Sequence, residues 1–140
     1  METRITAAFG LDKKDYTQYS PLTLAYIGDA VFDLVIRTIL VSRHDMQTDK
    51  LHRMASGVVK APVQAAMAEA LLSQMSQEEE KIYRRGKNAN PAHQAKNASR
   101  TDYQKATGLE ALIGYLYLTD QEERLMALIR DGMEKLEIKL

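Results

Sequence analysis

The chain has 140 residues, with 19 basic residues, 19 acidic residues and no cysteine. A chain of this length can bury an extensive core, and the lack of cysteine excludes disulfide bonds and thiolate metal sites. The most apolar window, residues 22–41, is interrupted by charged residues, and the N-terminal residues have no apolar stretch typical of a signal peptide. We therefore expect one soluble, cytoplasmic domain over residues 1–140 and no membrane span.

The charges balance overall but are unevenly distributed. Residues 81–105 contain seven basic residues and one acidic residue, Asp102, which gives this basic segment a local net charge of +6. A polyanion is the partner that such a segment fits, although a solvated surface is the common alternative.

The hydrophobic periodicity predicts an all-α protein of six or seven helices, and no convincing alternation indicates a strand. The longest predicted helix covers residues 21–43, with Ser20 as its N-cap and Pro21 in its first turn. Its apolar residues wrap most of the circumference, so we expect it in the core or against a partner. We assign no role to residues 1–19.

Two shorter helices are predicted next in the chain. The first covers residues 48–55 and is expected to end at the pair Ser56 and Gly57, which interrupts the pattern. The second continues to about residue 75, with Pro62 near its first turn or at a kink.

The segment that begins at Ser76 has both ends of a small helix. Ser76 and Glu79 have the spacing of a capping box. Gly86 is expected at the C′ position, where a left-handed residue commonly ends a helix. Residues 87–99 contain three Asn and one Pro with no apolar period, so we expect an irregular loop.

Two further helices complete the pattern. One is predicted from residue 101 or 102 to residue 118. The last is expected to begin at Asp120, with Glu123 at the capping-box position.

Two of the apolar helices carry a carboxylate beside a glycine. Gly28 precedes Asp29, and Glu110 stands between Gly108 and Gly114. Glycine costs about 1 kcal/mol relative to alanine inside a helix, so these positions indicate a close approach of two backbones. If the helices pack face to face, the two carboxylates meet, and Mg²⁺ or Mn²⁺ is the kind of ion that would join them. From spacing alone, two unrelated and partly exposed acids are the better explanation.

Other charged and metal-binding patterns have simple explanations. Asp33 and Arg37 are four residues apart on one helix, which predicts a surface ion pair. The three histidines, His44, His52 and His93, do not have the spacing of zinc ligands.

Two segments together resemble the signature motifs of the ribonuclease III family. They are LAYIGDAVFDLVIR (residues 24–37) and LEALIGYLYLTD (residues 109–120). The chain length, AYIGDA, and RRGKNAN (residues 84–90) make the chain similar to Mini-ribonuclease III, the branch that lacks a double-stranded-RNA-binding domain. The resemblance covers residues 21–118. It implies a homodimeric, all-helical, Mg²⁺-dependent endoribonuclease that cuts double-stranded RNA and leaves 5′-phosphate and 3′-hydroxyl ends.

The resemblance also implies roles for particular residues. Asp29 and Glu110 match the two essential acids that bind the catalytic metal, and Tyr26 is expected in the dimer interface. Standard members have two further acids where this chain has Ala25 and Thr107, which leaves the number of metal ions open. We hypothesise that the Thr107 hydroxyl helps through a water or a substrate contact.

By this resemblance the catalytic domain must hold the RNA itself. Double-stranded RNA is recognised mainly through its shape, its phosphates and its 2′-hydroxyls. Cations and amides of the basic segment are suited to these contacts. The expected RNA-binding residues are Arg84, Arg85, Lys87, Asn88, Asn90, Lys96 and Arg100.

Three functions remain open from the sequence. The first is a ribonuclease that matures structured precursor RNA such as ribosomal RNA. The second is a non-catalytic dimer that binds structured RNA or ribosomal proteins, and the retained pair Asp29 and Glu110 argues against it. The third is a helical interaction protein with no nucleic-acid partner, and the basic segment argues against it less strongly.

Overall fold

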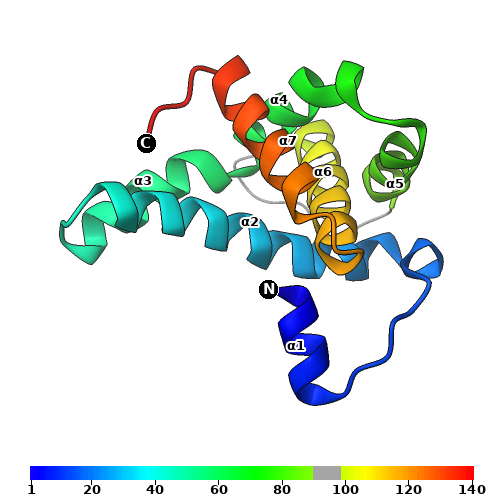
Figure 1. Cartoon of the computed structure of the whole chain (residues 1–140). Helices are drawn as coiled ribbons and strands as arrows, with labels where there is room; N and C mark the ends of the chain where they lie inside the picture. The colour runs from blue at the N-terminus through cyan, green and yellow to red at the C-terminus, as the bar shows by residue number, and fades with distance from the viewer. Residues whose placement is uncertain (90–98) are drawn as a thin grey trace.

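The computed structural model describes residues 1–89 and 99–140, and within these ranges all regular structure is helical (Figure 1). This confirms the predicted all-α class, with seven α-helices and two short 3₁₀ turns in the described residues. In chain order the elements are α1 (Glu2–Phe9), η1 (Tyr16–Gln18), α2 (Pro21–Arg43), α3 (Thr48–Val59), α4 (Ala61–Leu71), η2 (Leu72–Gln74), α5 (Gln77–Asn88), α6 (Arg100–Leu118) and α7 (Glu122–Lys135).

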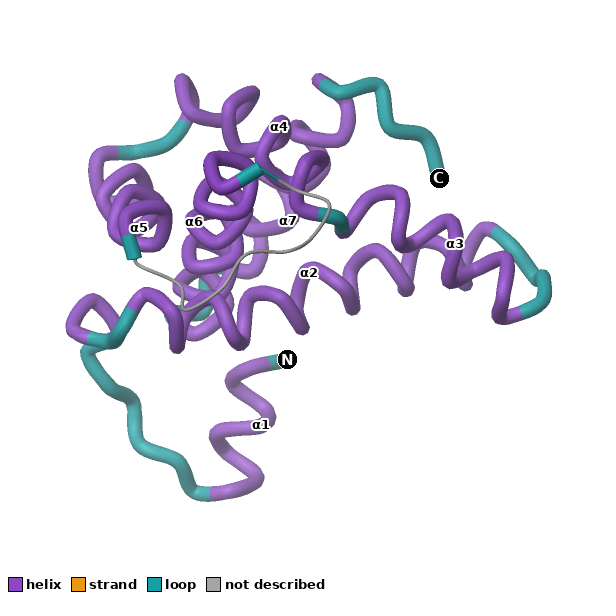
Figure 2. The backbone as a smooth tube through the Cα atoms, turned by 180° about the vertical axis from the view of Figure 1, so that it is seen from behind, coloured by secondary structure: helices purple, strands orange, loops and turns teal. Residues whose placement is uncertain are grey.

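Helix α6 is the central element of the core. It packs against α2, α5, α4 and α7, and the two opposite views show it surrounded by these helices (Figures 1 and 2). Residues 106–109 and 111–117 of α6 are all buried. Phe32 and Ile36 of α2 and Leu112 and Leu116 of α6 are fully buried in the same cluster. Side chains on α6 are therefore held by neighbours on several sides.

The start of α2 is as the sequence predicts. Pro21 occupies the first turn, and the Ser20 Oγ accepts a hydrogen bond from the Leu22 backbone N–H at 3.3 Å. The predicted surface pair is also confirmed, with Arg37 Nε 2.8 Å from Asp33 Oδ2. No helix in the described ranges is long and apolar enough to cross a membrane.

The predicted break at Ser56 and Gly57 is wrong, because α3 continues through both residues to Val59. A Cβ atom added at Gly57 would meet nothing within 4 Å. The cost of this glycine is about 1 kcal/mol of helix propensity, which packing of α3 against α2 outweighs. Pro62 lies in the first turn of α4, as predicted, and the chain passes from α4 into η2 before residue 75.

The capping box at the start of α5 is confirmed, since Ser76 and Glu79 exchange hydrogen bonds of 3.1 and 2.8 Å. The predicted end at Gly86 is wrong, because α5 continues to Asn88. A Cβ at Gly86 would lie only 2.9 Å from the Gly108 Cα of α6. Gly86 is thus a helix-packing residue and not a C′ residue.

The predicted start of the last helix at Asp120 is also wrong. Helix α7 begins at Glu122, its N-cap is Gln121, and no side chain caps it. Asp120 has a φ of 58°, in the left-handed region. Since an N-cap residue adopts an extended conformation, Asp120 belongs to the turn between α6 and α7.

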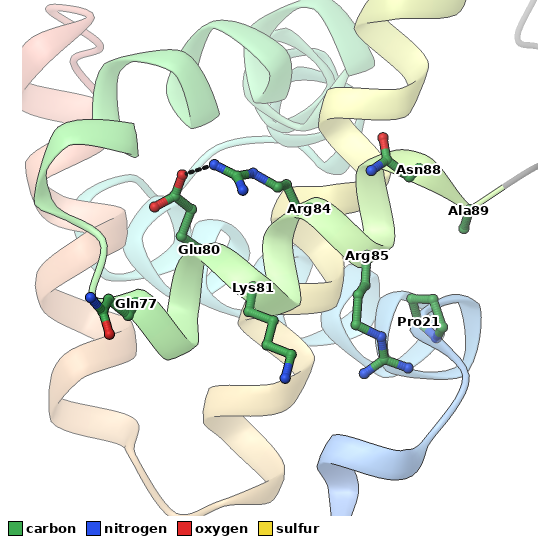
Figure 3. A pocket seen from close by; sticks show the side chains of 8 residues that line it. All are labelled: Pro21, Gln77, Glu80, Lys81, Arg84, Arg85, Asn88 and Ala89. Carbon is green, nitrogen blue, oxygen red and sulfur yellow. Dashed lines mark hydrogen bonds and ion pairs between the residues drawn. The ribbon is translucent and has the colours of Figure 1, made fainter.

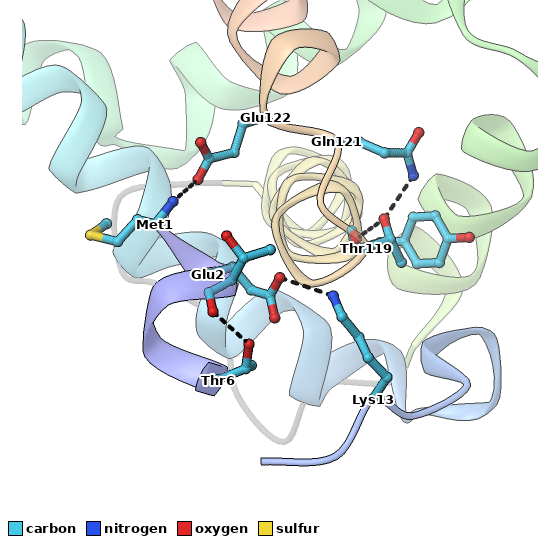
Figure 4. Close-up of polar contacts among 9 residues, drawn as sticks. Met1, Glu2, Thr6, Lys13, Thr119, Gln121 and Glu122 are labelled. Carbon is cyan, nitrogen blue, oxygen red and sulfur yellow. Dashed lines mark hydrogen bonds and ion pairs between the residues drawn. The ribbon is translucent and has the colours of Figure 1, made fainter. Parts of the chain in front are cut away.

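The N-terminal segment, to which the sequence assigned no role, is attached to the rest of the fold by polar contacts (Figure 4). The Met1 backbone nitrogen lies 2.6 Å from Glu122 Oε1 at the start of α7. Glu2 is buried, and Lys13 Nζ donates to its Oε1 at 3.1 Å. The first contact joins the start of α1 to the start of α7, and the second joins α1 to the segment that follows it.

Candidate active site

The site begins with a contact between two backbones. A Cβ atom at Gly28 of α2 would lie 1.8 Å from the Glu110 carbonyl oxygen, and one at Gly114 of α6 would lie 2.0 Å from the Leu24 carbonyl oxygen. No side chain fits at either position, so α2 and α6 touch through their main chains. This confirms that Gly28 allows another helix to approach.

The two acids that flank this contact are brought together. Asp29 is exposed and Glu110 is half-buried. Burial of its carboxyl group is the main cause that raises the pKa of Glu110 to about 8, and the neighbouring Asp29 carboxylate raises this pKa further. Without a bound cation, Glu110 therefore retains a proton near neutral pH. A cation between the two carboxylates would remove the repulsion that favours this proton.

A third side chain at Glu110 is one that the sequence did not indicate. Gln64 of α4 is 2% exposed, and its side-chain amide lowers the pKa of the Glu110 carboxyl group, against the larger effects of burial and Asp29. The sequence showed only a polar residue within the apolar segment PVQAAMAEAL. This pattern does not reveal which residue of another helix Gln64 lies close to.

The donor set fits a hard divalent cation. It consists of carboxylate oxygens from two helices, and oxygen is the ligand that Mg²⁺ and Mn²⁺ prefer. Within the described ranges no cluster of three or more His, Cys, Asp or Glu side chains is placed to hold a metal. An ion here would thus have few protein ligands, which suits Mg²⁺ because it usually keeps several waters.

The two positions that depart from the family pattern lie one turn before the acids. Ala25 is buried, with 7% of its surface exposed. The Thr107 hydroxyl is also buried and donates to the Tyr103 carbonyl oxygen at 2.9 Å. This hydroxyl is thus already bonded within its own helix, and a role for it in catalysis stays a hypothesis.

The part of the basic segment that lies on α5 lines a pocket close to the start of α2, with Lys81, Arg84, Arg85 and Asn88 among its lining residues (Figure 3). Arg84 forms an ion pair with Glu80 on the same helix. Arg85 donates to the Thr17 carbonyl oxygen at 2.7 Å and to the Tyr19 carbonyl oxygen at 3.1 Å. Arg85 therefore ties α5 to the segment before α2, in addition to any contact with RNA.

The other expected RNA-binding residues are placed as follows. Lys87 is half-buried close to Glu69, whose pKa it lowers less strongly than Lys105 does. Asn88 is exposed and lines the same pocket as Arg84, and Arg100 is exposed at the start of α6. Asn90 and Lys96 lie outside the described residues.

Tyr26 lies on a face of α2 that the described residues leave uncovered. Its side chain is 81% exposed, and Leu22, one turn earlier, is 43% exposed. Large apolar side chains are usually buried, so this exposure is compatible with an interface. The role of Tyr26 in a dimer stays a prediction.

Two neighbouring acids on touching helices form a site suited to a metal-dependent hydrolase, and comparison with known proteins identifies the family. Residues 22–121 match the family model described as the ribonuclease III domain. The chain therefore belongs to the ribonuclease III family and is an endoribonuclease of this type. Enzymes of this family depend on a metal ion and act on double-stranded RNA.

Curated relatives cover most of the chain. A Mini-ribonuclease 3 of Enterococcus faecalis is 46% identical over 124 residues, which cover 87% of this chain and 94% of that protein. A Mini-ribonuclease 3 of Staphylococcus aureus is 45% identical over 112 residues, which cover 79% of this chain and 84% of that protein. The crystal structure of a Fusobacterium nucleatum protein, 30% identical, superimposes with a TM-score of 0.79 and covers 87% of this chain and 99% of that one.

Proposed function

We propose that this endoribonuclease cleaves double-stranded RNA in structured precursors such as ribosomal RNA, with Mg²⁺, or Mn²⁺ in its place, held by Asp29 and Glu110. The observation that carries the proposal is the meeting of these two carboxylates at a crossing where the backbones of α2 and α6 touch. We further propose that it acts in the cytoplasm, since its curated relatives are bacterial proteins.

The protein's part in the reaction follows from the placement of these groups. Asp29 and Glu110 offer carboxylate oxygens from two helices whose separation is fixed by main-chain contact. When bound, a divalent ion at such a site supplies an activated water and stabilises charge on the phosphate oxygens. The carboxylate of Glu110 must lose its proton for this, and the Gln64 amide favours the ionised form. Hydrolysis of the phosphodiester leaves a 5′-phosphate and a 3′-hydroxyl.

The RNA would be held by the basic segment. Arg84, Lys87, Asn88 and Arg100 offer cations and an amide to phosphates and 2′-hydroxyls, which suits recognition of duplex shape. Arg85 would act partly by fixing the start of α2, through its bonds to the segment before it.

A symmetric homodimer would let each protomer cut one strand of the duplex. The exposed side chain of Tyr26 and its apolar neighbours on α2 are the surface we assign to this contact. A dimer with a two-fold axis needs a self-complementary patch, and one helix face can supply it.

The test compares the wild-type protein with Asp29→Asn on duplex RNA. We expect cleavage by the wild type with Mg²⁺, none with EDTA, and none by Asp29→Asn, while both proteins bind the duplex. If no metal-dependent cleavage occurs but the duplex is bound, the protein is a binder and the proposed activity is wrong. If the wild type does not bind the duplex, the proposed double-stranded RNA substrate is also wrong.

A further inference from the structure

Helix α1 is a short helix that its own protomer leaves mostly uncovered. It has eight residues, and among them only Glu2 is buried. Ile5 and Phe9 lie four residues apart on one face, both are exposed, and Phe9 is 76% exposed. An isolated helix of this length is marginal in water. Helix α1 therefore needs further packing, which the described residues of this protomer do not supply.

Helix α2 carries a second uncovered apolar surface. Its exposed face has a row of apolar residues at intervals of four and then seven positions, namely Leu22, Tyr26, Ala30, Leu34 and Val41. This row is the α2 strip. At 1.5 Å per residue it is about 28 Å long. It begins with the surface around Tyr26 that we assign to the homodimer and continues to Val41, which is 66% exposed.

The exposed face of α2 is too small to form a stable dimer by itself. Stable interfaces bury about 800 Å² on each partner and contain about 20–30 residues from each. Helix α2 has 23 residues in all, and about a third of them lie on one face. The proposed homodimer therefore requires a second element beside the α2 strip.

Helix α1 is placed to be this second element. In both views it lies on the opposite side of α2 from α4 and α5, below the N-terminal half of α2 (Figures 1 and 2). The α2 strip also faces away from the core, because Gly28 and the other buried residues of α2 are on the opposite face, against α6. Helix α1 and the α2 strip are thus exposed on the same side of the protomer.

Charge favours a second copy of the chain over RNA or a membrane as the partner of α1. Residues 1–19 contain three basic and three acidic residues. A segment without net charge is not attracted to RNA phosphates or to anionic lipid headgroups. A two-fold axis across the middle of the α2 strip would pair the two ends of the strip. Helix α1 of one protomer would then lie over the C-terminal half of the strip of its partner.

We propose that α1 is a dimerisation arm, whose Ile5 and Phe9 side chains pack against Leu34 and Val41 of the partner subunit. This inference rests on the proposed homodimer and adds a contact outside the surface around Tyr26. By symmetry two such contacts form, one on each side of the two-fold axis. The N-terminal segment then has a role, which is to strengthen the dimer in which each protomer cuts one strand.

The first test is the dissociation constant of the dimer, measured by analytical ultracentrifugation of the full chain. A variant with both Ile5→Ser and Phe9→Ser loses the apolar face of α1, and we expect its dissociation constant to rise about 10- to 100-fold. Tyr26→Ser should raise the constant as well, because it alters the surface assigned to the dimer. The matched control is Leu72→Ser in η2, an exposed apolar residue outside both surfaces, which should leave the constant unchanged.

The second test is disulfide cross-linking, which is clean because the chain has no cysteine. Two cysteines can be bridged only when their Cα atoms lie within about 7 Å. Phe9→Cys protein is mixed under oxidising conditions with Leu34→Cys or with Val41→Cys protein, and we expect a mixed disulfide-linked dimer from at least one pair. Phe9→Cys mixed with Leu72→Cys should give none.

The outcomes separate the arm from the dimer on which it rests. If the wild type stays monomeric at every concentration, both the proposed homodimer and the arm are wrong. If Tyr26→Ser weakens the dimer but the Ile5 and Phe9 variant dimerises like the wild type, the arm is overturned and the homodimer stands. Should that variant unfold, the cross-link decides, and its absence from both Phe9→Cys mixtures overturns the arm.

Discussion

Replacement of Gly28 by alanine tests the backbone contact on which the site is built. The added Cβ would lie 1.8 Å from the Glu110 carbonyl oxygen and 2.8 Å from the Gly114 backbone nitrogen. Carbon and oxygen atoms normally approach to about 3.3 Å, so α2 and α6 would have to separate by roughly 1.5 Å. Both neighbouring atoms belong to the main chain, and no side-chain rotation can relieve the overlap.

The expected magnitude is the difference of two opposing effects. Overpacking costs about 1–3 kcal/mol and occasionally more, and a clash with main chain belongs at the upper end. Alanine returns about 1 kcal/mol of helix propensity. We therefore expect Gly28→Ala to lower the free energy of unfolding by at least about 2 kcal/mol. This corresponds to a fall in Tm of roughly 6–10 °C for a chain of this length.

The matched control is Gly57→Ala, which makes the same exchange inside α3. A Cβ there would meet nothing within 4 Å, so this variant should be more stable than the wild type by about 0.5–1 kcal/mol. Thermal melts at one protein concentration compare the two variants. Gly28→Ala should also weaken Mn²⁺ binding, because Asp29 and Glu110 move apart. Equal Tm shifts in the two variants would refute the backbone contact.

Three further predictions concern charged residues of α5 and, for Glu79, its partner Arg124 on α7. Hydrogen bonding from Arg124 lowers the pKa of Glu79, so the unfolded state binds more protons and the free energy of unfolding decreases as the pH is lowered through the acid range. Arg124→Gln should flatten this slope in urea titrations, and an unchanged slope would contradict it. Arg85→Ala should lower the free energy of unfolding by about 1–3 kcal/mol, because two hydrogen bonds are lost. Arg84→Ala loses only an exposed ion pair and should lower it by less than about 1 kcal/mol, as measured by thermal melts of both variants. Arg84→Ala should also reduce the salt dependence of duplex binding by about one phosphate contact in a filter-binding series, and an unchanged salt slope would remove Arg84 from the RNA surface.

Features fixed by neighbouring residues were predictable from the sequence. The N-cap at Ser20 and the capping box of Ser76 with Glu79 involve hydrogen bonds across two or three positions, and both are present as predicted. The pair Asp33 and Arg37 is equally local. Each of these signals is complete within one helical turn, so no knowledge of the partner helix is needed.

Glycines show where local reasoning fails. Gly57 and Gly86 both predicted a helix end, and both lie inside helices. At Gly57 the missing side chain meets nothing, whereas at Gly86 it makes room for Gly108 of another helix. The sequence alone does not distinguish these two glycines. Only the position of the neighbouring helix shows that Gly57 is tolerated and that Gly86 is required.

The site was predictable only in part. Spacing alone favoured two unrelated acids, and the resemblance to the ribonuclease III family was needed to pair Asp29 with Glu110. Gln64 was missed because a glutamine in an apolar helix belongs to no motif until α4 is placed against α6. Arg85 was expected to bind RNA, and its bonds to the Thr17 and Tyr19 carbonyl oxygens could not be foreseen from a segment without a pattern.

The construction of the acid pair explains why the contact between α2 and α6 is so close. Two acids four residues apart on one helix are held only by their own side-chain torsions, and both tend to face solvent. Here each acid comes from a different helix, and the helices meet at Gly28 and Gly114 with no side chain between them. The distance between the carboxylates is then set by main-chain contact, and one of them is half-buried while the other stays exposed. Burial of Glu110 and its repulsion from Asp29 make it unfavourable for both carboxylates to be ionised. A divalent cation between them would offset this unfavourable energy. Glycine weakens each helix by about 1 kcal/mol, and this loss of stability is what allows the two acids to approach as the proposed metal site requires.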